Sequence, residues 1–176
     1  MGMFLTSHSR FEQLNTPEKW KLIDNQLYKD DDGSIYLCPR NYITDGFTIP
    51  NFLSVVAGSK MNYDTRASSQ HDFECSYHCA IRVNMSEHRL RKMGLLTTSN
   101  GLNVCENIPQ KYLTIQSMTF EETNKRFVRM LQSVNNIPNW RRFLIGKAVS
   151  LNVAWLFSKH NYDKSKLYEV DYELLK

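Results

Sequence analysis

A short polar run that ends in glycine, Lys29-Asp-Asp-Asp-Gly33, constrains the fold of this chain more than any other feature. Before it, Trp20 to Tyr28 alternates apolar and polar residues around one turn, and after it Ser34-Ile-Tyr-Leu-Cys38 is rich in β-branched and aromatic residues. Such alternation is typical of strands, and glycine supplies the positive φ of a tight turn. Pro39 ends the second strand because proline cannot donate to a ladder. The pattern predicts an antiparallel hairpin.

Several segments of the remaining chain have helical spacing. Thr119-Phe-Glu-Glu122 has the spacing of a capping box and predicts a helix start. Asn124 lies on the apolar stripe of that helix, so it should point inward and need a hydrogen-bond partner. Further helices are predicted in three places: from Asp64 or Thr65 to about Val83, from Ser86 to Gly94, and from Pro138 through Trp155.

These elements predict a single domain over residues 1–176 with an α+β fold. We expect a small antiparallel sheet or hairpin at the N-terminal side, packed against three or four helices. Between the helices, the pattern from Leu95 to Ser117 is weak and contains turn signals such as Ser99-Asn100-Gly101. We therefore expect an insertion or an irregular loop around 95–117.

Composition places the chain among ordinary globular proteins, with 41% apolar residues, 23% charged residues and a formal net charge of +4. This mild positive charge does not by itself indicate a polyanionic partner. The first ten residues do not resemble a secretory signal, and the most apolar stretch, Phe143 to Phe157, is shorter than a membrane crossing. We expect a cytoplasmic protein without a membrane partner, in which the four cysteines stay reduced.

Residue types that support catalysis gather in two places: in the stretch from Tyr42 to Pro50 and about twenty residues later. Asp45 and Thr48 lie in the first and His71 and Asp72 in the second. Carboxylate and imidazole act as general acids or bases and also bind metals, so these four residues are candidates for a hydrolytic centre, and Asp45, His71 and Asp72 for a divalent metal site. The alternative is structural: the same side chains cap turns and join a loop to a helix.

A second group of metal-ligand types, His71, Cys75, His78 and Cys79, would lie on one predicted helix. Four ligands from a single helix cannot surround a tetrahedral zinc ion, so at most two of them could share a metal with Asp45 or Cys38. Cys75 or Cys79 could also act as a nucleophile activated by a histidine, which requires a lowered thiol pKa. The alternative for the cysteines is packing as small apolar side chains.

The spacing of Asp45-Gly-Phe-Thr-Ile-Pro50, His71-Asp72, Arg126-Phe127 and Asn139-Trp-Arg-Arg-Phe143 resembles the domain of unknown function 1353 family of phages and prophages. The resemblance covers roughly Leu22 to Phe157 and implies a phage origin and a shared site, but no activity. Two positions depart from the family. Cys75 stands where an aromatic residue is usual, and Asn124 stands where an acidic residue is usual. If that acid served a metal or a catalytic water, this copy of the site is weakened or inactive.

Two functions follow from these patterns. The first is a phage-type cytoplasmic protein with a hydrolase-like or metal-assisted site at Asp45, Thr48, His71 and Asp72, intact or degenerate. The second is a non-catalytic protein that binds a host protein or nucleic acid through basic helices. The residues proposed for this second function are Arg82, Arg89, Arg91 and Lys92. Basic residues also commonly cover the solvent faces of helices, which is the structural alternative.

Overall fold

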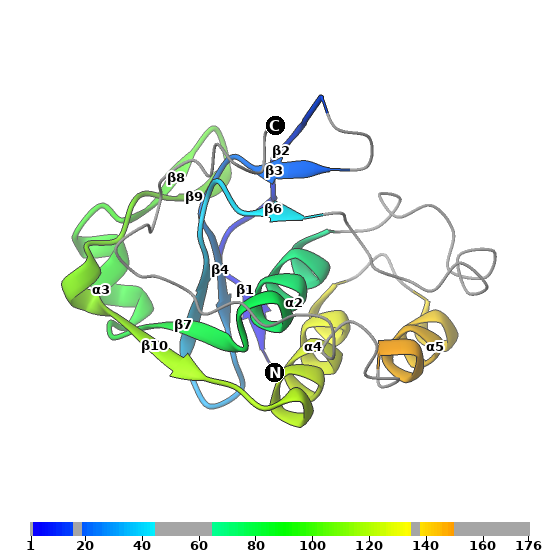
Figure 1. Ribbon diagram of the computed structural model, residues 1–176. Coiled ribbons are helices and arrows are strands. Elements are labelled where there is room, and N and C mark those ends of the chain that lie inside the picture. The colour runs from blue at the N-terminus through cyan, green and yellow to red at the C-terminus, as the bar shows by residue number, and fades with distance from the viewer. Residues whose placement is uncertain (1, 16–18, 45–64, 135–137, 150–176) are drawn as a thin grey trace.

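The computed structural model describes residues 2–15, 19–44, 65–134 and 138–149, and all structural statements concern these residues. They form ten strands in three antiparallel sheets, together with four α-helices and one short 3-10 helix. In Figure 1, helices α2, α4 and α5 lie on one side of the largest sheet, and α3 lies on the other side with the β8–β9 hairpin.

The largest sheet has five strands in the order β1-β4-β5-β7-β10, and every neighbouring pair is antiparallel. The strands are β1 (Met3–Phe4), β4 (Gln26–Lys29), β5 (Ile35–Cys38), β7 (Cys79–Val83) and β10 (Leu113–Ser117). The β4–β5 pair confirms the predicted hairpin, with Gly33 at φ 83° in its turn.

Two smaller sheets complete the strand content of the described residues. One has the order β2-β3-β6, from Phe11–Gln13, Trp20–Leu22 and Ile43–Thr44, and the other is the hairpin of β8 (Leu96–Ser99) and β9 (Leu102–Cys105). The helices are α2 (Arg66–Tyr77), α3 (Glu87–Lys92), α4 (Phe120–Ser133) and α5 (Asn139–Val149), and the 3-10 helix η1 spans Gln110–Tyr112. No helix of the described residues is long and apolar enough to cross a membrane.

The predicted fold class was wrong, because the fold is dominated by sheet and is not a small hairpin packed on helices. The main reason is the helix predicted from residue 64 or 65 to about Val83. This helix ends at Tyr77, and His78 takes a left-handed conformation with φ 50°. Cys79–Val83 then forms β7, which lies between β5 and β10 in the sheet. The β-branched Ile81 and Val83 suit this half-buried strand surface.

The stretch 95–117 is also not irregular, contrary to the prediction. It contains the β8–β9 hairpin, whose turn places Asn100 and Gly101 at φ 51° and 76°, and then η1 and β10. β10 pairs with β7 over five residues, from Leu113 opposite Val83 to Ser117 opposite Cys79. This segment therefore contributes an edge strand to the main sheet.

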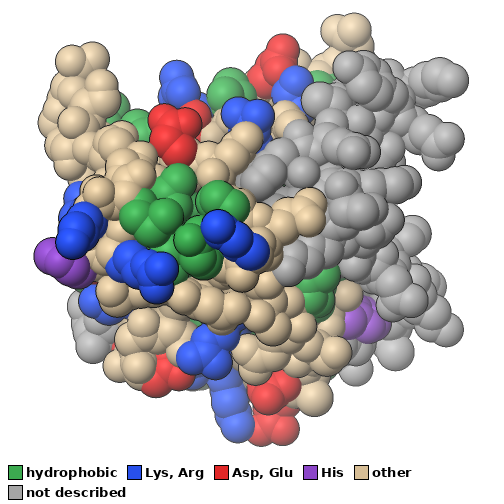
Figure 2. Space-filling model, turned by 90° about the vertical axis from the view of Figure 1, so that its left-hand side faces the viewer, with side chains coloured by type: hydrophobic (Ala, Val, Ile, Leu, Met, Phe, Trp, Pro, Cys, Tyr) green, Lys and Arg blue, Asp and Glu red, His purple; other side chains and the backbone are tan. Residues whose placement is uncertain are grey.

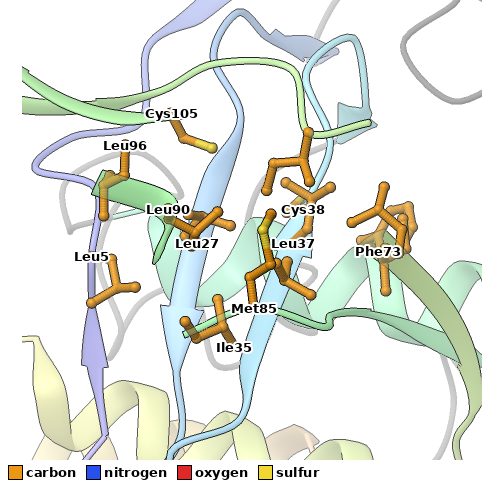
Figure 3. Close-up of a cluster of buried hydrophobic side chains, with 14 of the residues drawn as sticks. Leu5, Leu27, Ile35, Leu37, Cys38, Phe73, Met85, Leu90, Leu96 and Cys105 are labelled. Atoms are coloured by element: carbon orange, nitrogen blue, oxygen red, sulfur yellow. The ribbon is translucent and has the colours of Figure 1, made fainter. Parts of the chain in front are cut away.

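Alternation along the strands gives the main sheet two buried faces. On one face, Leu27, Leu37 and Ile81 are direct cross-strand neighbours and pack with Leu90 of α3 and Leu96 of β8. Figure 3 shows Leu27, Leu37, Leu90 and Leu96 gathered with other members of this cluster. Because Leu37 is fully buried, its truncation to alanine should cost about 2–5 kcal/mol.

The opposite face of the sheet carries a row of larger side chains, in which Phe4, Tyr28 and Tyr36 are successive cross-strand neighbours. Tyr28 and Tyr36 pack in the cluster that contains Phe127 and Met130 of α4. α4 begins with the predicted capping box: the Thr119 side chain accepts from the backbone N–H of Glu122, and the Glu122 carboxylate accepts from that of Thr119. α4 packs against α2, and its residues Asn124 and Phe127 contact that helix.

Candidate functional site

His71 lies at the interface of α2 and α4 and contacts two residues of α4. Its Nε2 atom is 3.1 Å from Oδ1 of Asn124, and its ring centroid is 4.3 Å from that of Phe127. Only 6% of His71 is exposed. The prediction that Asn124 points inward and needs a partner is confirmed, and the partner is the histidine of the predicted site.

Asp72 of α2 contacts β6, the strand that ends at Thr44 just before Asp45. Oγ1 of Thr44 donates a 2.7 Å hydrogen bond to Oδ2 of Asp72, while Oδ1 of Asp72 lies 3.9 Å from Nδ1 of His71. The structure thus brings together His71, Asp72 and the residue next to Asp45. Asp45 and Thr48 themselves lie outside the described residues, so their predicted roles stay predictions.

The contacts of His71 favour its charged form. Burial by itself would lower the pKa of the imidazole, but its interactions with Asp72 and Cys75 outweigh burial and raise that pKa to about 10. Asp72 contributes the largest of these raising interactions, and its Oδ1 atom lies 3.9 Å from Nδ1 of His71. On the other side of the ring, an amide oxygen needs an N–H donor at Nε2. An imidazolium at neutral pH has no lone pair with which to take up a proton or bind a metal.

The cysteine and histidine group predicted on one helix is divided between two elements. Cys75 stays on α2, with Sγ 3.4 Å from Nε2 of His71, whereas His78 follows the helix and Cys79 lies in β7. Burial raises the pKa of the Cys79 thiol to about 12, which opposes its predicted use as a nucleophile. Within the part of the chain that the structure describes, no three His, Cys, Asp or Glu side chains form a group that could hold a metal ion.

A buried ionic cluster beside His71 was not predicted. Nη1 of Arg126 donates to Oε1 of Glu74 at 2.8 Å, and the Arg126 guanidinium lies 3.6 Å from the centre of the Tyr36 ring. Glu74 is fully buried and Arg126 is 4% exposed. Burial raises the pKa of Glu74, and Arg126 opposes that rise. The sequence holds no local signal for this pair, because 52 positions separate its members.

The cluster extends to Asp30 in the β4–β5 turn. Arg129 makes two 2.7 Å hydrogen bonds to the Asp30 carboxylate, and Nε of Arg126 lies 3.7 Å from it. Burial would raise the pKa of Asp30, but Arg129 and Arg126 hold it below its ordinary value. Asp30 belongs to the polar run that predicted only a turn, so the structure gives it a second role as an anchor for α4.

The four basic residues proposed for binding do not lie together. Arg89, Arg91 and Lys92 are exposed on α3, whose Leu90 packs against the leucine-rich face of the main sheet. Arg82 lies in β7 directly opposite Tyr36, so it points to the other face of the sheet. Figure 2 shows the side of the molecule on which α3 lies in Figure 1, with Lys and Arg side chains around a central group of apolar ones.

One aromatic side chain accompanies the cations of α3. The Arg89 guanidinium lies 5.5 Å from the centre of the Tyr112 ring, and Nζ of Lys111 lies 5.0 Å from it. Tyr112 is half-buried and Lys111 is exposed. We call Arg89, Arg91, Lys92, Lys111 and Tyr112 the α3 basic face. Lys111 and Tyr112 were missed because they lie in the stretch predicted as an irregular loop.

Comparison with known proteins gives no match: no family model, curated protein or solved structure is similar to this chain. The resemblance to the domain of unknown function 1353 family therefore rests on the residues quoted for it.

Proposed function

We propose that this chain is a non-catalytic, phage-type protein that binds single-stranded nucleic acid through the α3 basic face in the host cytoplasm. In this proposal, His71 and its partners hold α2 against α4 and perform no chemistry. The resemblance described above supports the phage origin. The charged state and burial of His71 support its structural role.

The observation that carries the binding proposal is the grouping of exposed cations around Tyr112. Arg89 and Lys111 flank its ring, and Arg91 and Lys92 extend the positive charge along α3. Glu87 partly offsets this charge, because it pairs with Arg91 at 3.2 Å. Cations next to an aromatic ring suit a single strand, whose phosphates bind the cations while an unpaired base displaces one of the side chains over the ring and stacks there.

The test is fluorescence anisotropy of a labelled single-stranded oligonucleotide with the full chain, between about 50 and about 200 mM salt. Arg89→Gln combined with Lys92→Gln should weaken binding and lower the slope of log affinity against log salt by about 1.4, because each phosphate contact contributes about 0.7 on a single strand. Arg10→Gln with Arg40→Gln is the matched control, since both cations are exposed and lie outside the α3 basic face. The proposal fails if the wild type does not bind or if the two double variants behave alike.

A second candidate is the hydrolase-like or metal-assisted centre at Asp45, Thr48, His71 and Asp72. The hydrogen bond from Thr44 to Asp72 favours it, because it holds Thr44, the residue before Asp45, at Asp72 next to His71 in the sequence. Metal content of the purified full chain, compared with a His71→Ala variant, tests this candidate. Stoichiometric metal that is lost in the variant would support it. A metal-free wild type, with lower stability in the variant, would support the structural role.

A further inference from the structure

A groove of about 550 Å³ runs between α4 and α5, on a different part of the molecule from the α3 basic face. Phe120, Val128 and Phe143 supply most of its apolar lining, and Asn124, the partner of His71, also lines it. Gly146 of α5 faces Val128 of α4, because a Cβ atom at Gly146 would lie 3.4 Å from Cγ2 of Val128, an ordinary van der Waals contact. In Figure 1, α4 and α5 are neighbouring helices.

The apolar side chains at this groove are unusually exposed. Phe143 is 63% exposed and Val128 is 41% exposed, and Trp140 and Leu144 on the same helix as Phe143 are 54% and 36% exposed. Large apolar side chains that gather on a surface indicate an interaction site, and aromatic residues are the commonest anchors of such sites. Ile145 of α5 is buried and belongs to the core cluster that contains Phe127 and Met130 of α4.

The charged residues of the lining have one predominant sign. Four are cations, Lys125, Arg129, Arg142 and Lys147, and one is an anion, Glu121. Glu121 pairs with Lys125, and Asp30, which is not part of the lining, pairs with Arg129. Arg142 donates to neutral acceptors, the backbone oxygen of Val134 and Oδ1 of Asn139. The groove therefore favours an anionic ligand.

The dimensions fit a helix. The lining residues of α4 span Phe120 to Arg129, which at 1.5 Å per residue is about 14 Å or two and a half helical turns. They recur at four-residue spacing, as do Phe143 and Lys147 on α5. A third helix laid between two helices presents apolar residues at i, i+3, i+4 and i+7, and its flanks reach the rim. We propose that this groove binds an acidic amphipathic helix of a partner protein.

The probe is a designed peptide of about 18 residues, long enough for about five helical turns, with leucine at i, i+3, i+4 and i+7 and glutamate on its flanks. Two matched peptides carry lysine in place of glutamate, or the same residues in scrambled order. Calorimetric titration of the full chain should show binding of the acidic amphipathic peptide. The lysine peptide should bind at least about tenfold more weakly, and the scrambled peptide should not bind.

The variant is Val128→Glu, which places a carboxylate in the groove at a position that is already 41% exposed. The control is Ile23→Glu, at a position outside the groove that is 39% exposed. Val128→Glu should lower the affinity at least about tenfold, and Ile23→Glu should leave it unchanged. Three results overturn the proposal: no binding of the acidic peptide, equal binding of the lysine peptide, or equal binding to both variants. Two further results would also overturn it. One is self-association of the chain that Val128→Glu abolishes, and the other is binding of the fatty acid decanoate without binding of the peptide.

Discussion

Oδ1 of Asn124 accepts a hydrogen bond from Nε2 of His71 at 3.1 Å and thereby joins α4 to α2 across a buried interface. The resemblance to the phage family implies an acidic residue at position 124. An amide there keeps the acceptor but not the negative charge, so the charge partner of His71 among the described residues is Asp72, at 3.9 Å. The site thus keeps a hydrogen-bonded contact between the two helices.

Replacing Asn124 should show this structural role directly. Asn124→Ala removes the oxygen acceptor of the buried His71 N–H and leaves it only the weak acceptor Sγ of Cys75 at 3.4 Å, so it should lower the free energy of unfolding by about 1–3 kcal/mol in urea denaturation. Asn124→Asp keeps an acceptor and adds an opposite charge, so it should be at least as stable as the wild type at neutral pH. The neighbouring exposed Lys125→Ala should change stability by no more than about 0.5 kcal/mol. Equal effects of Asn124→Ala and Lys125→Ala would refute the role.

Stability should also depend on pH through His71. Its pKa in the folded chain is about 10, above the ordinary value of 6.5, so folding favours the charged form. The stabilisation is complete below pH 6.5 and is lost as pH rises toward 10, at up to about 1.4 kcal/mol per pH unit. Because other groups titrate in this range, the measurement compares urea unfolding of the wild type and His71→Gln at several pH values. Parallel curves would contradict the prediction.

Arg126 should be costly to remove by itself. Arg126→Met leaves the Glu74 carboxylate, which is fully buried, without its 2.8 Å partner, and should lower the free energy of unfolding by about 3–5 kcal/mol. Replacing Glu74 as well, in Glu74→Leu/Arg126→Met, removes both charges and should recover most of that loss. Thermal and urea unfolding of the two variants test this. A double variant no more stable than the single one would show that the charge of Glu74 is not the cause.

The capping box of α4 makes a smaller, local contribution. Thr119→Ala removes the acceptor for the N–H of Glu122 and should cost about 1 kcal/mol in urea unfolding, whereas Thr119→Ser should keep the cap. Glu121→Ala is the control in the same first turn, because its ion pair with Lys125 is exposed and contributes about 0.5 kcal/mol or less. If Thr119→Ala and Glu121→Ala are equally stable, the cap does not contribute as expected.

Local patterns predicted some of these features and missed others for identifiable reasons. The β4–β5 hairpin and the capping box depend on residues within a few positions of one another, and both were predicted. β7 was missed because no glycine or proline separates it from α2, and the change of direction occurs at a non-glycine residue, His78. β10 was missed because its partner β7 lies about thirty positions earlier, and its exposed residues weaken the pattern.

In the candidate site, too, local patterns predicted one contact and missed another. Helical periodicity predicted that Asn124 points inward. Packing of α2 against α4 then brings Asn124 to His71. The ion pair of Glu74 and Arg126 has no comparable signal, because Arg126 lies directly beside the apolar stripe of α4 and its partner is on another helix. Long-range pairings of this kind depend on tertiary packing, which a short sequence pattern does not encode.

We propose that His71 is a buried, positively charged contact between two helices and not a catalytic base. Long-range proton–nitrogen NMR spectra of the full chain, recorded across a pH titration, measure the protonation of both ring nitrogens directly. We expect His71 to carry protons on Nδ1 and Nε2 at neutral pH and to lose one only as pH approaches about 10. A His71 ring that titrates near its ordinary pKa of 6.5, with an unprotonated nitrogen at neutral pH, would contradict it.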